Sequence, residues 1–299
     1  MTGPTGDVDI VEDRSLPTPD GRTIAWTECG DPLGRVLLRM PGTPGSRFAL
    51  RADRTPWIER GLRVITTERP GFGASTAWPD RGFHGPADDV ARILDELAID
   101  DVALMGGSGG GPHVLAFAAR HADRVQAASI VVGAAPMEED EIGQMIDLNQ
   151  RSSRLARTGD VEQLRALMEE QRAAILADPL ATFRAIMATA PPEDQDVMSD
   201  HVWQQAFVRG VTESLRHGVD GWLHEALALE HAWDEIDVES IKTSITWWAS
   251  DDDRNCPLSA AQRLFARLPN ARMNIWTGGG HLSPYRREAE ILDELLGRC

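Results

Sequence analysis

The sequence contains few cysteines, and they lie far apart. Cys29, Cys256 and Cys299 are the three among 299 residues. An odd number of widely spaced cysteines predicts neither a disulfide framework nor a C-x-x-C metal pattern. We therefore expect free thiols and no metal site.

Positive charge is also scarce. The 30 Lys and Arg residues stand against 47 Asp and Glu residues, which gives a formal net charge of −17 and a pI near 4.8. Nucleic-acid phosphates and anionic membrane surfaces would repel such a chain at long range. This excludes both as partners. We expect a small-molecule substrate, and the sequence leaves a homodimer open.

Long apolar runs are absent as well. The segment from Met1 to Asp7 has neither a basic n-region nor an apolar h-region. No later stretch approaches the roughly 18 apolar residues of a membrane span. We expect a cytoplasmic protein.

What the chain does contain is an alternation of short aliphatic runs and helical stretches, which is typical of a mostly parallel sheet with crossover helices. Helices are marked by apolar residues at spacings of three and four. The expected strands are Asp9 to Glu12, Thr23 to Glu28, Val36 to Met40, Val64 to Glu68, Val102 to Met105, Ala127 to Val132, Ser244 to Ala249 and Arg272 to Trp276. The expected helices are Arg47 to Arg60, Pro86 to Leu97, Pro112 to Arg120, Ser259 to Leu268 and Pro284 to Leu296.

The strand pattern is interrupted between Met137 and Glu239 by polar helical stretches, such as Val161 to Ala177 with a predicted cap at Asp160 and Gln163. We expect a core domain of residues 1–136 and 241–299 and an inserted helical cap, or lid, of residues 137–240. This lid contains 22 acidic residues and 8 arginines, a net charge of −14. Its acidity fits either a solvated helical surface or a lid that attracts cationic substrates.

A motif for nucleophilic catalysis follows the apolar run Val102 to Met105. The next residues read Gly-Gly-Ser-Gly-Gly with Ser108 at the centre, and a helical pattern comes after them. The motif G-x-S-x-G between a strand and a helix is the context of a nucleophile elbow, where glycines allow a sharp turn. We identify Ser108 as the candidate nucleophile.

A serine hydroxyl needs a base to take its proton, and a third group must orient that base. His281 lies in a glycine-rich loop directly after the last predicted strand, whereas the other histidines mostly lie on helical patterns. We identify His281 as the base. Three adjacent aspartates, Asp251 to Asp253, follow the preceding strand and are the candidates for the acid.

At this point the sequence resembles the α/β-hydrolase family, in its serine hydrolase branch that includes esterases and proline iminopeptidases. Many members carry a turn of the form G-x-x-D-x-x-x-P, and Ser250 to Pro257 match it with Ser250 in place of Gly. The resemblance implies that Asp253 is the acid, with Asp252 as the alternative. It also implies an α/β-hydrolase fold, with a mostly parallel central sheet flanked by helices and an inserted helical lid.

Acyl transfer also needs donors for the charge that develops on the carbonyl oxygen. One is the amide of Gly109, after the nucleophile. Pro41 to Ser46 resemble the family's H-G-T-P-G-S loop, which implies the Thr43 N–H as the second. Pro41 replaces the usual histidine, a side chain that often orders this loop. Glu68 to Ser75 resemble the family's D-R-P-G-x-G-x-S turn, which we interpret as structural.

The predicted reaction is cleavage of an ester, lactone or amide bond of a small to medium organic substrate through an acyl-enzyme. It requires neither a metal nor an organic cofactor. Phe72, Trp203 and Trp222 are candidates for substrate contact, although packing within the lid explains the two tryptophans equally well.

Two other functions stay open. One is an aminopeptidase of the proline iminopeptidase type, with Glu138 to Glu141 around a cationic amine. The other is a non-hydrolytic ligand-binding protein, or a cofactor-free cyclase or lyase, on the same fold. Haloalkane dehalogenases and epoxide hydrolases would need an aspartate at Ser108, and the latter also use lid tyrosines. Tyr285 is the one tyrosine, outside the lid.

Overall fold

The computed structural model describes residues 11–51 and 53–297. Within them, eight strands form one sheet in the order β1-β2-β4-β3-β5-β6-β7-β8. Strand β2 runs antiparallel to both of its neighbours, and all other neighbouring pairs are parallel. The strands are β1 (Glu12–Pro17), β2 (Thr23–Gly30), β3 (Arg35–Met40), β4 (Leu62–Glu68), β5 (Val102–Gly107), β6 (Val125–Val131), β7 (Ile245–Ser250) and β8 (Ala271–Trp276).

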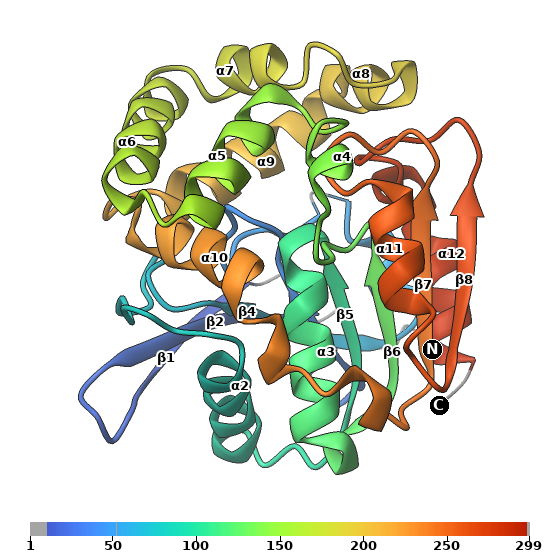
Figure 1. Cartoon of the computed structure of the whole chain (residues 1–299). Helices are drawn as coiled ribbons and strands as arrows, with labels where there is room; N and C mark the ends of the chain where they lie inside the picture. The colour runs from blue at the N-terminus through green and yellow to red at the C-terminus, as the bar shows by residue number, and fades with distance from the viewer. Residues whose placement is uncertain (1–10, 52, 298–299) are drawn as a thin grey trace.

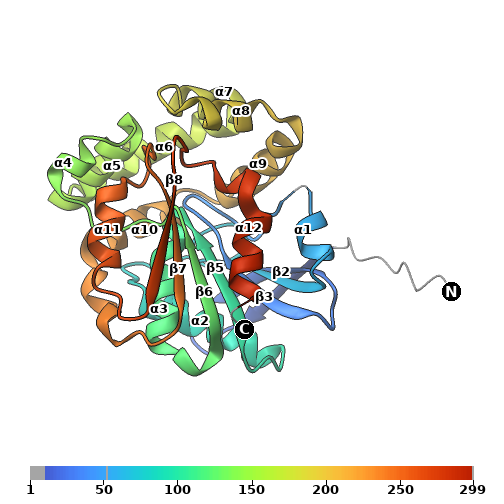
Figure 2. The same cartoon turned by 90° about the vertical axis from the view of Figure 1, so that its right-hand side faces the viewer.

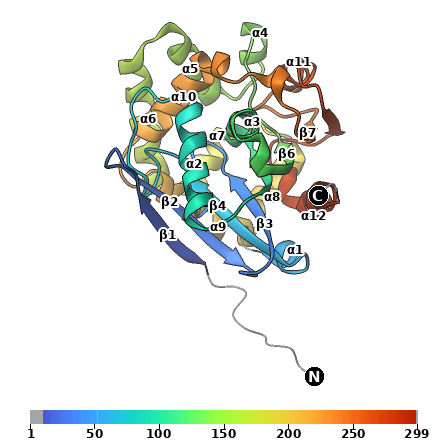
Figure 3. The same cartoon turned by 90° about the horizontal axis from the view of Figure 1, so that it is seen from below.

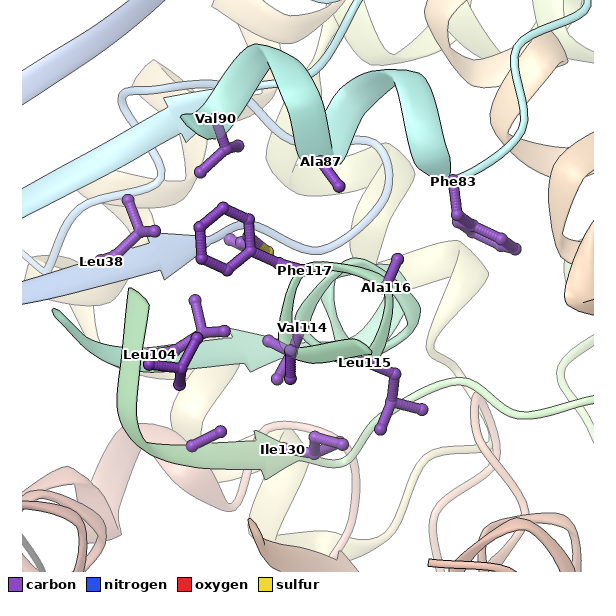
Figure 4. Packing of buried hydrophobic residues seen from close by; sticks show 14 of the residues in the cluster. Leu38, Phe83, Ala87, Val90, Leu104, Val114, Leu115, Ala116, Phe117 and Ile130 are labelled. Carbon is purple, nitrogen blue, oxygen red and sulfur yellow. The ribbon is translucent and has the colours of Figure 1, made fainter. Parts of the chain in front are cut away.

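Helices cover both faces of this sheet (Figures 1 and 3). One face packs against α2 (His84–Glu96), α3 (Gly111–Arg120) and α11 (Leu258–Phe265), and the other against α1 (Thr55–Ile58) and α12 (Pro284–Leu296). Helix α3 is central because nearly all of its residues are buried, and Figure 4 shows Phe117 between α2 and Leu38 of β3. The mostly parallel, helix-flanked sheet predicted from the sequence is confirmed.

A separate group of helices follows β6 and lies above the carboxyl ends of the parallel strands (Figures 1 and 2). We call them the inserted helices. They are α4 (Glu139–Ile142), α5 (Asp147–Thr158), α6 (Val161–Ala177), α7 (Pro179–Ile186), α8 (Pro192–Ser199), α9 (His201–Ser214) and α10 (Asp220–His231). Short 3₁₀ turns are η1 (Ser108–Gly110), η2 (Ala122–Arg124), η3 (Trp233–Glu235) and η4 (Val238–Ser240). The predicted cap of α6 is present, because the Asp160 side chain accepts from the Gln163 N–H.

Two predictions at the start of the chain need correction. The strand expected at Asp9 to Glu12 lies partly outside the described residues, and β1 instead begins at Glu12 and continues to Pro17. The helix expected from Arg47 to Arg60 is reduced to α1. The first part of the predicted helix is not helical because its backbone groups form other hydrogen bonds. The Arg47 N–H donates to Glu68, and the Ala49 carbonyl accepts from Arg39.

None of the helices in the described part of the chain combines the length and the apolar character that crossing a membrane requires.

Candidate active site

Ser108 lies at the sharp turn between β5 and α3. Its φ of +53° is in the left-handed region, which a non-glycine residue occupies only under strain. The glycines around it are required by space. A Cβ on Gly106 would come within 2.7 Å of the Gly110 carbonyl oxygen, and a Cβ on Gly110 within 2.2 Å of the Met40 carbonyl oxygen. The turn directs Ser108 into a cavity of about 340 Å³, which His281 also lines.

His281 is held by a carboxylate on the neighbouring loop. Its Nδ1 lies 2.8 Å and 3.0 Å from the two carboxylate oxygens of Asp253. Asp253 is buried, and its Oδ1 also accepts from the N–H groups of Asn255 and Cys256. The backbone of this turn therefore fixes the position of the Asp253 carboxylate independently of its contact with His281.

The two other aspartates of this turn have different partners. Asp251 accepts from the Gly278 N–H at 2.7 Å, and Asp252 pairs with Arg254 at 3.2 Å on the surface. Of the three candidates, the structure brings Asp253 to His281.

Helix α8, one of the inserted helices, binds the backbone of the loop that carries His281 and Leu282, which we call the histidine loop. Asp194, which is 1% exposed, accepts from the N–H groups of His281 and Leu282 at 2.9 Å and 2.8 Å. Burial lowers the pKa of His281, but the charge of Asp253, its hydrogen bond and the charge of Asp194 raise it by more. The pKa of His281 therefore lies above its ordinary value.

Cys256 is a buried free thiol beside these groups, whereas Cys299 lies outside the described residues. The Cys256 sulfur and the ligand atoms of Asp253 and His281 lie within 4.8 Å of one another. They form the one cluster of possible metal ligands found in the described residues. Burial and the Asp253 charge raise the pKa of the Cys256 thiol well above its usual range, and a hydrogen bond with Ser108 lowers it by less. Metal binding needs the thiolate, so the raised pKa works against it.

The loop from Pro41 to Ser46 lies against the turn that carries Ser108. A Cβ on Gly109 would be 2.2 Å from the Thr43 hydroxyl and 3.4 Å from the Thr43 nitrogen, so the two backbones are in close approach. The Thr43 N–H donates to no acceptor among the described residues. Arg69 fixes this loop, because it donates to the carbonyls of Pro41 and Gly42 and, at 2.8 Å, to the Thr43 hydroxyl.

Arg69 is in turn held by Glu225 of α10, whose side chain is fully buried. The Glu225 carboxylate lies 3.1 Å from Arg69 Nε, forms an ion pair with Arg81, and lies 2.9 Å from His113 Nε2. We call these four residues the Glu225 cluster. Burial raises the pKa of Glu225, but the positive charges around it hold it well below its usual range. Burial lowers the pKa of His113 to about 4, so a neutral imidazole donates to the carboxylate.

None of these four residues stands out in the sequence as part of a site. Arg69 was visible only within a turn interpreted as structural, and His113 as one of several helical histidines. The available signal was a charged residue on the apolar side of a helix: Glu225 stands between Leu223 and Ala226, and both are buried.

The cavity at Ser108 is lined by Trp203 and, beside it, by Phe207, Leu282 and Tyr285. Two of the predicted contact residues are not part of it. Phe72 and Trp222 are buried instead in an apolar cluster that joins α6, α9 and α10, because Gly71 and Gly221 bring the two chain segments together.

The four acids from Glu138 to Glu141 do not line the cavity either. Glu138 and Glu141 form the capping box of α4 and pair with Arg263, and Glu139 pairs with Arg154 and Arg157.

Comparison with known proteins places this geometry in a family. A family model described as "alpha/beta hydrolase fold" matches residues 49–287. The chain is 26% identical over 286 residues to the 2-hydroxy-6-oxononadienedioate/2-hydroxy-6-oxononatrienedioate hydrolase of Cupriavidus pinatubonensis, covering 90% of this chain and 88% of that protein. It is 29% identical over 120 residues to a bifunctional esterase/perhydrolase of Acinetobacter calcoaceticus, covering 40% of this chain and 44% of that one.

Solved structures agree in fold. A bromoperoxidase from Bacillus anthracis superposes with a TM-score of 0.70 at 19% identity, covering 96% of this chain and 99% of that chain.

Removing the charge of Glu225 is predicted to destabilise the protein and loosen the loop at Thr43. Glu225→Gln leaves Arg69 and Arg81 without a buried counter-charge, which costs about 3–5 kcal/mol in comparable sites. We expect a lower free energy of unfolding in urea and a lower kcat. Glu239→Gln, which breaks the exposed pair with Arg267, is the control and is expected to change both far less. Equal effects of the two substitutions would contradict the role of the cluster.

The pH dependence tests the contact between α8 and His281. The raised pKa of His281 predicts that kcat/KM increases with pH through a midpoint above the ordinary histidine value, because His281 must be neutral to act as the base that the sequence predicts. Asp194→Asn removes a negative charge that favours the imidazolium, so the midpoint is expected to move to lower pH. Asp196→Asn, on the same helix but exposed and paired with Arg286, is the control. A midpoint that stays in place in Asp194→Asn, or rises, would sink this electrostatic assignment.

Proposed function

The chain belongs to the α/β-hydrolase family, and from this premise we propose that it is a serine hydrolase. Its reaction is the cleavage of an ester, lactone or amide bond of a small to medium organic substrate. The observation that carries the proposal is that His281, hydrogen-bonded to Asp253, lines the same cavity as Ser108, which is held at a positive φ.

The proposed reaction begins when Ser108 Oγ attacks the substrate carbonyl carbon and its proton passes to His281 Nε2. The Nδ1–H of His281 donates to Asp253, which keeps the ring in the required tautomer and stabilises the imidazolium. The tetrahedral intermediate collapses as His281 returns the proton to the leaving group. A water that His281 deprotonates then hydrolyses the acyl-enzyme.

The charge on the carbonyl oxygen is proposed to be stabilised by two amides, on Thr43 and Gly109. Their close approach and the lack of an acceptor for the Thr43 N–H support this role. Preorganised donors of this kind contribute about 10²- to 10³-fold each to kcat. The hydrogen bonds from Arg69 to the loop that carries Thr43, which we call the Arg69 clamp, hold Thr43 in position in the absence of substrate.

The inserted helices are proposed to act as a lid, residues 137–240, over a core of residues 1–136 and 241–299. Two observations support this role. Trp203 of these helices lines the cavity, and Asp194 accepts a hydrogen bond from the backbone of the histidine loop. A wall of this kind limits the access of bulk water to the cavity, which strengthens the electrostatic interactions at Ser108.

Of the two other functions, the aminopeptidase has less support, because none of the acids from Glu138 to Glu141 lines the cavity and three of them, Glu138, Glu139 and Glu141, are paired with arginines. The non-hydrolytic alternative predicts no covalent intermediate. A fluorophosphonate probe followed by intact-mass measurement separates it from the proposal: capture on wild type, and none on Ser108→Ala, supports a hydrolase.

The acid has a sharp test within its own turn. Asp253→Asn is expected to lower kcat on p-nitrophenyl esters by on the order of ten-thousandfold, because the imidazole then takes the wrong tautomer. Asp252→Asn, one residue away and exposed, is the matched control and is expected to keep near wild-type kcat. If Asp252→Asn is the crippling change, the assignment is wrong by one residue.

A further inference from the structure

The cavity at Ser108 extends along the sheet to two polar residues that take no part in the proposed triad. Arg39 on β3 and Thr66 on β4 line it together with Ser108 and His281. The two residues are direct partners in the parallel ladder, so their side chains project from the same face of the sheet.

Both side chains are short of partners. The Thr66 hydroxyl is fully buried and forms no hydrogen bond. Arg39 donates once, from Nη1 to the Ala49 carbonyl at 3.0 Å, and its guanidinium lies 4.9 Å from the centre of the Trp57 ring. Its Nε is buried without a partner, and no carboxylate of the described residues lies within ion-pair distance of it.

The other charges that line the cavity do not compensate Arg39. Besides His281 they are Arg51 and Glu288, and these two pair with each other at 2.7 Å. Glu288 also accepts from the Trp57 indole N–H at 2.6 Å, so its two oxygens are already occupied. One positive charge is therefore left over in a cavity of a protein whose net charge is −17.

Arg39 is half-buried with its Nε fully buried, and the buried part of such a charge is costly without a partner. Burial lowers the pKa of Arg39, which is the sign of that cost, and Glu288 opposes the shift only from a distance. The guanidinium stays charged at all physiological pH values. A guanidinium binds a planar carboxylate through two parallel N–H···O bonds, and a neighbouring threonine hydroxyl supplies a further donor.

We infer that the substrate carries a carboxylate, which Arg39 and Thr66 bind while the bond to be cleaved lies at Ser108. This inference rests on the proposed function and narrows its substrates to esters, lactones or amides with an anionic arm. It also opposes a cationic amine as the second group of the substrate, because Arg39 would repel it within the cavity.

Paired substrates test the inference. Monomethyl esters of straight-chain dicarboxylic acids are compared with methyl alkanoates of equal length, and acetate esters of ω-hydroxy acids with alkyl acetates. The ratio of kcat/KM for the charged ester to that for its neutral partner is measured in each variant. Wild type is expected to prefer a charged ester in at least one series. Arg39→Met is expected to lower that preference about tenfold to a hundredfold, the range for a hydrogen bond to a charged group.

Three further variants complete the experiment. Arg39→Lys keeps the charge and is expected to retain part of the preference. Thr66→Val, which has nearly the same shape, is expected to lower it by a smaller factor. Arg35→Met is the control, because it removes the same charge from an exposed position on the same strand. Far-ultraviolet circular dichroism and thermal unfolding identify any variant that fails to fold.

A binding measurement separates this inference from the proposed function. Monomethyl adipate is titrated calorimetrically into Ser108→Ala and into the double variant Ser108→Ala/Arg39→Met, where the second substitution is expected to weaken binding by the same factor. If wild type shows no preference for any charged ester, or if Arg39→Met leaves the preference intact, the inference is overturned while the hydrolase stands. If no ester is cleaved and no probe reacts with Ser108, the hydrolase fails, and the titration still decides whether Arg39 binds a carboxylate.

Discussion

The buried carboxylate of Glu225 is the contact on which the rest of the site depends. It comes from α10, and its partners come from the turn after β4, from the segment before α2 and from α3. A fully buried carboxylate is stable only while its positive partners stay in place, and the partners need it for the same reason. The cluster therefore joins the inserted helices to the core. Arg69, which the cluster holds in place, fixes the loop at Thr43 through its hydrogen bonds.

The histidine loop is also held by carboxylates, one from the inserted helices and one from the core. Asp194 of α8 holds the backbone of His281 and Leu282, while Asp253 of the core holds the imidazole. Both loops beside Ser108 are thus fixed by acidic residues of the inserted helices. Some of the acidity of residues 137–240 therefore serves the interior, in addition to the solvated surface that the composition predicts.

How much the sequence predicts depends on how local the determinant is. Ser108 and His281 stand in glycine-rich loops next to strands, so neighbouring residues alone predict a nucleophile and a base at these positions. Asp253 needed the spacing of a family turn, because three adjacent aspartates are equivalent until their hydrogen bonds are known.

Determinants that are distant in sequence escape this reasoning. Arg39 and Thr66 meet only through strand pairing, and Glu225 meets Arg69 only through the packing of α10. Phe72 and Trp222 have the composition of a binding wall, yet packing places them inside a core. The segment after Pro44 has apolar residues at helical spacing, but its backbone groups form hydrogen bonds with the side chains of Arg39 on β3 and Glu68 on β4.

Pro41 stands where relatives of this fold often carry a histidine, and here a guanidinium orders the loop instead. An imidazole changes its charge near neutrality, whereas a guanidinium keeps its charge wherever the protein is folded. The donors of the Arg69 clamp are therefore the same in acid and in alkali. Near neutral pH, the imidazole of His281 is therefore the group beside Ser108 whose charge changes, whereas the guanidinium that holds the loop at Thr43 keeps its charge.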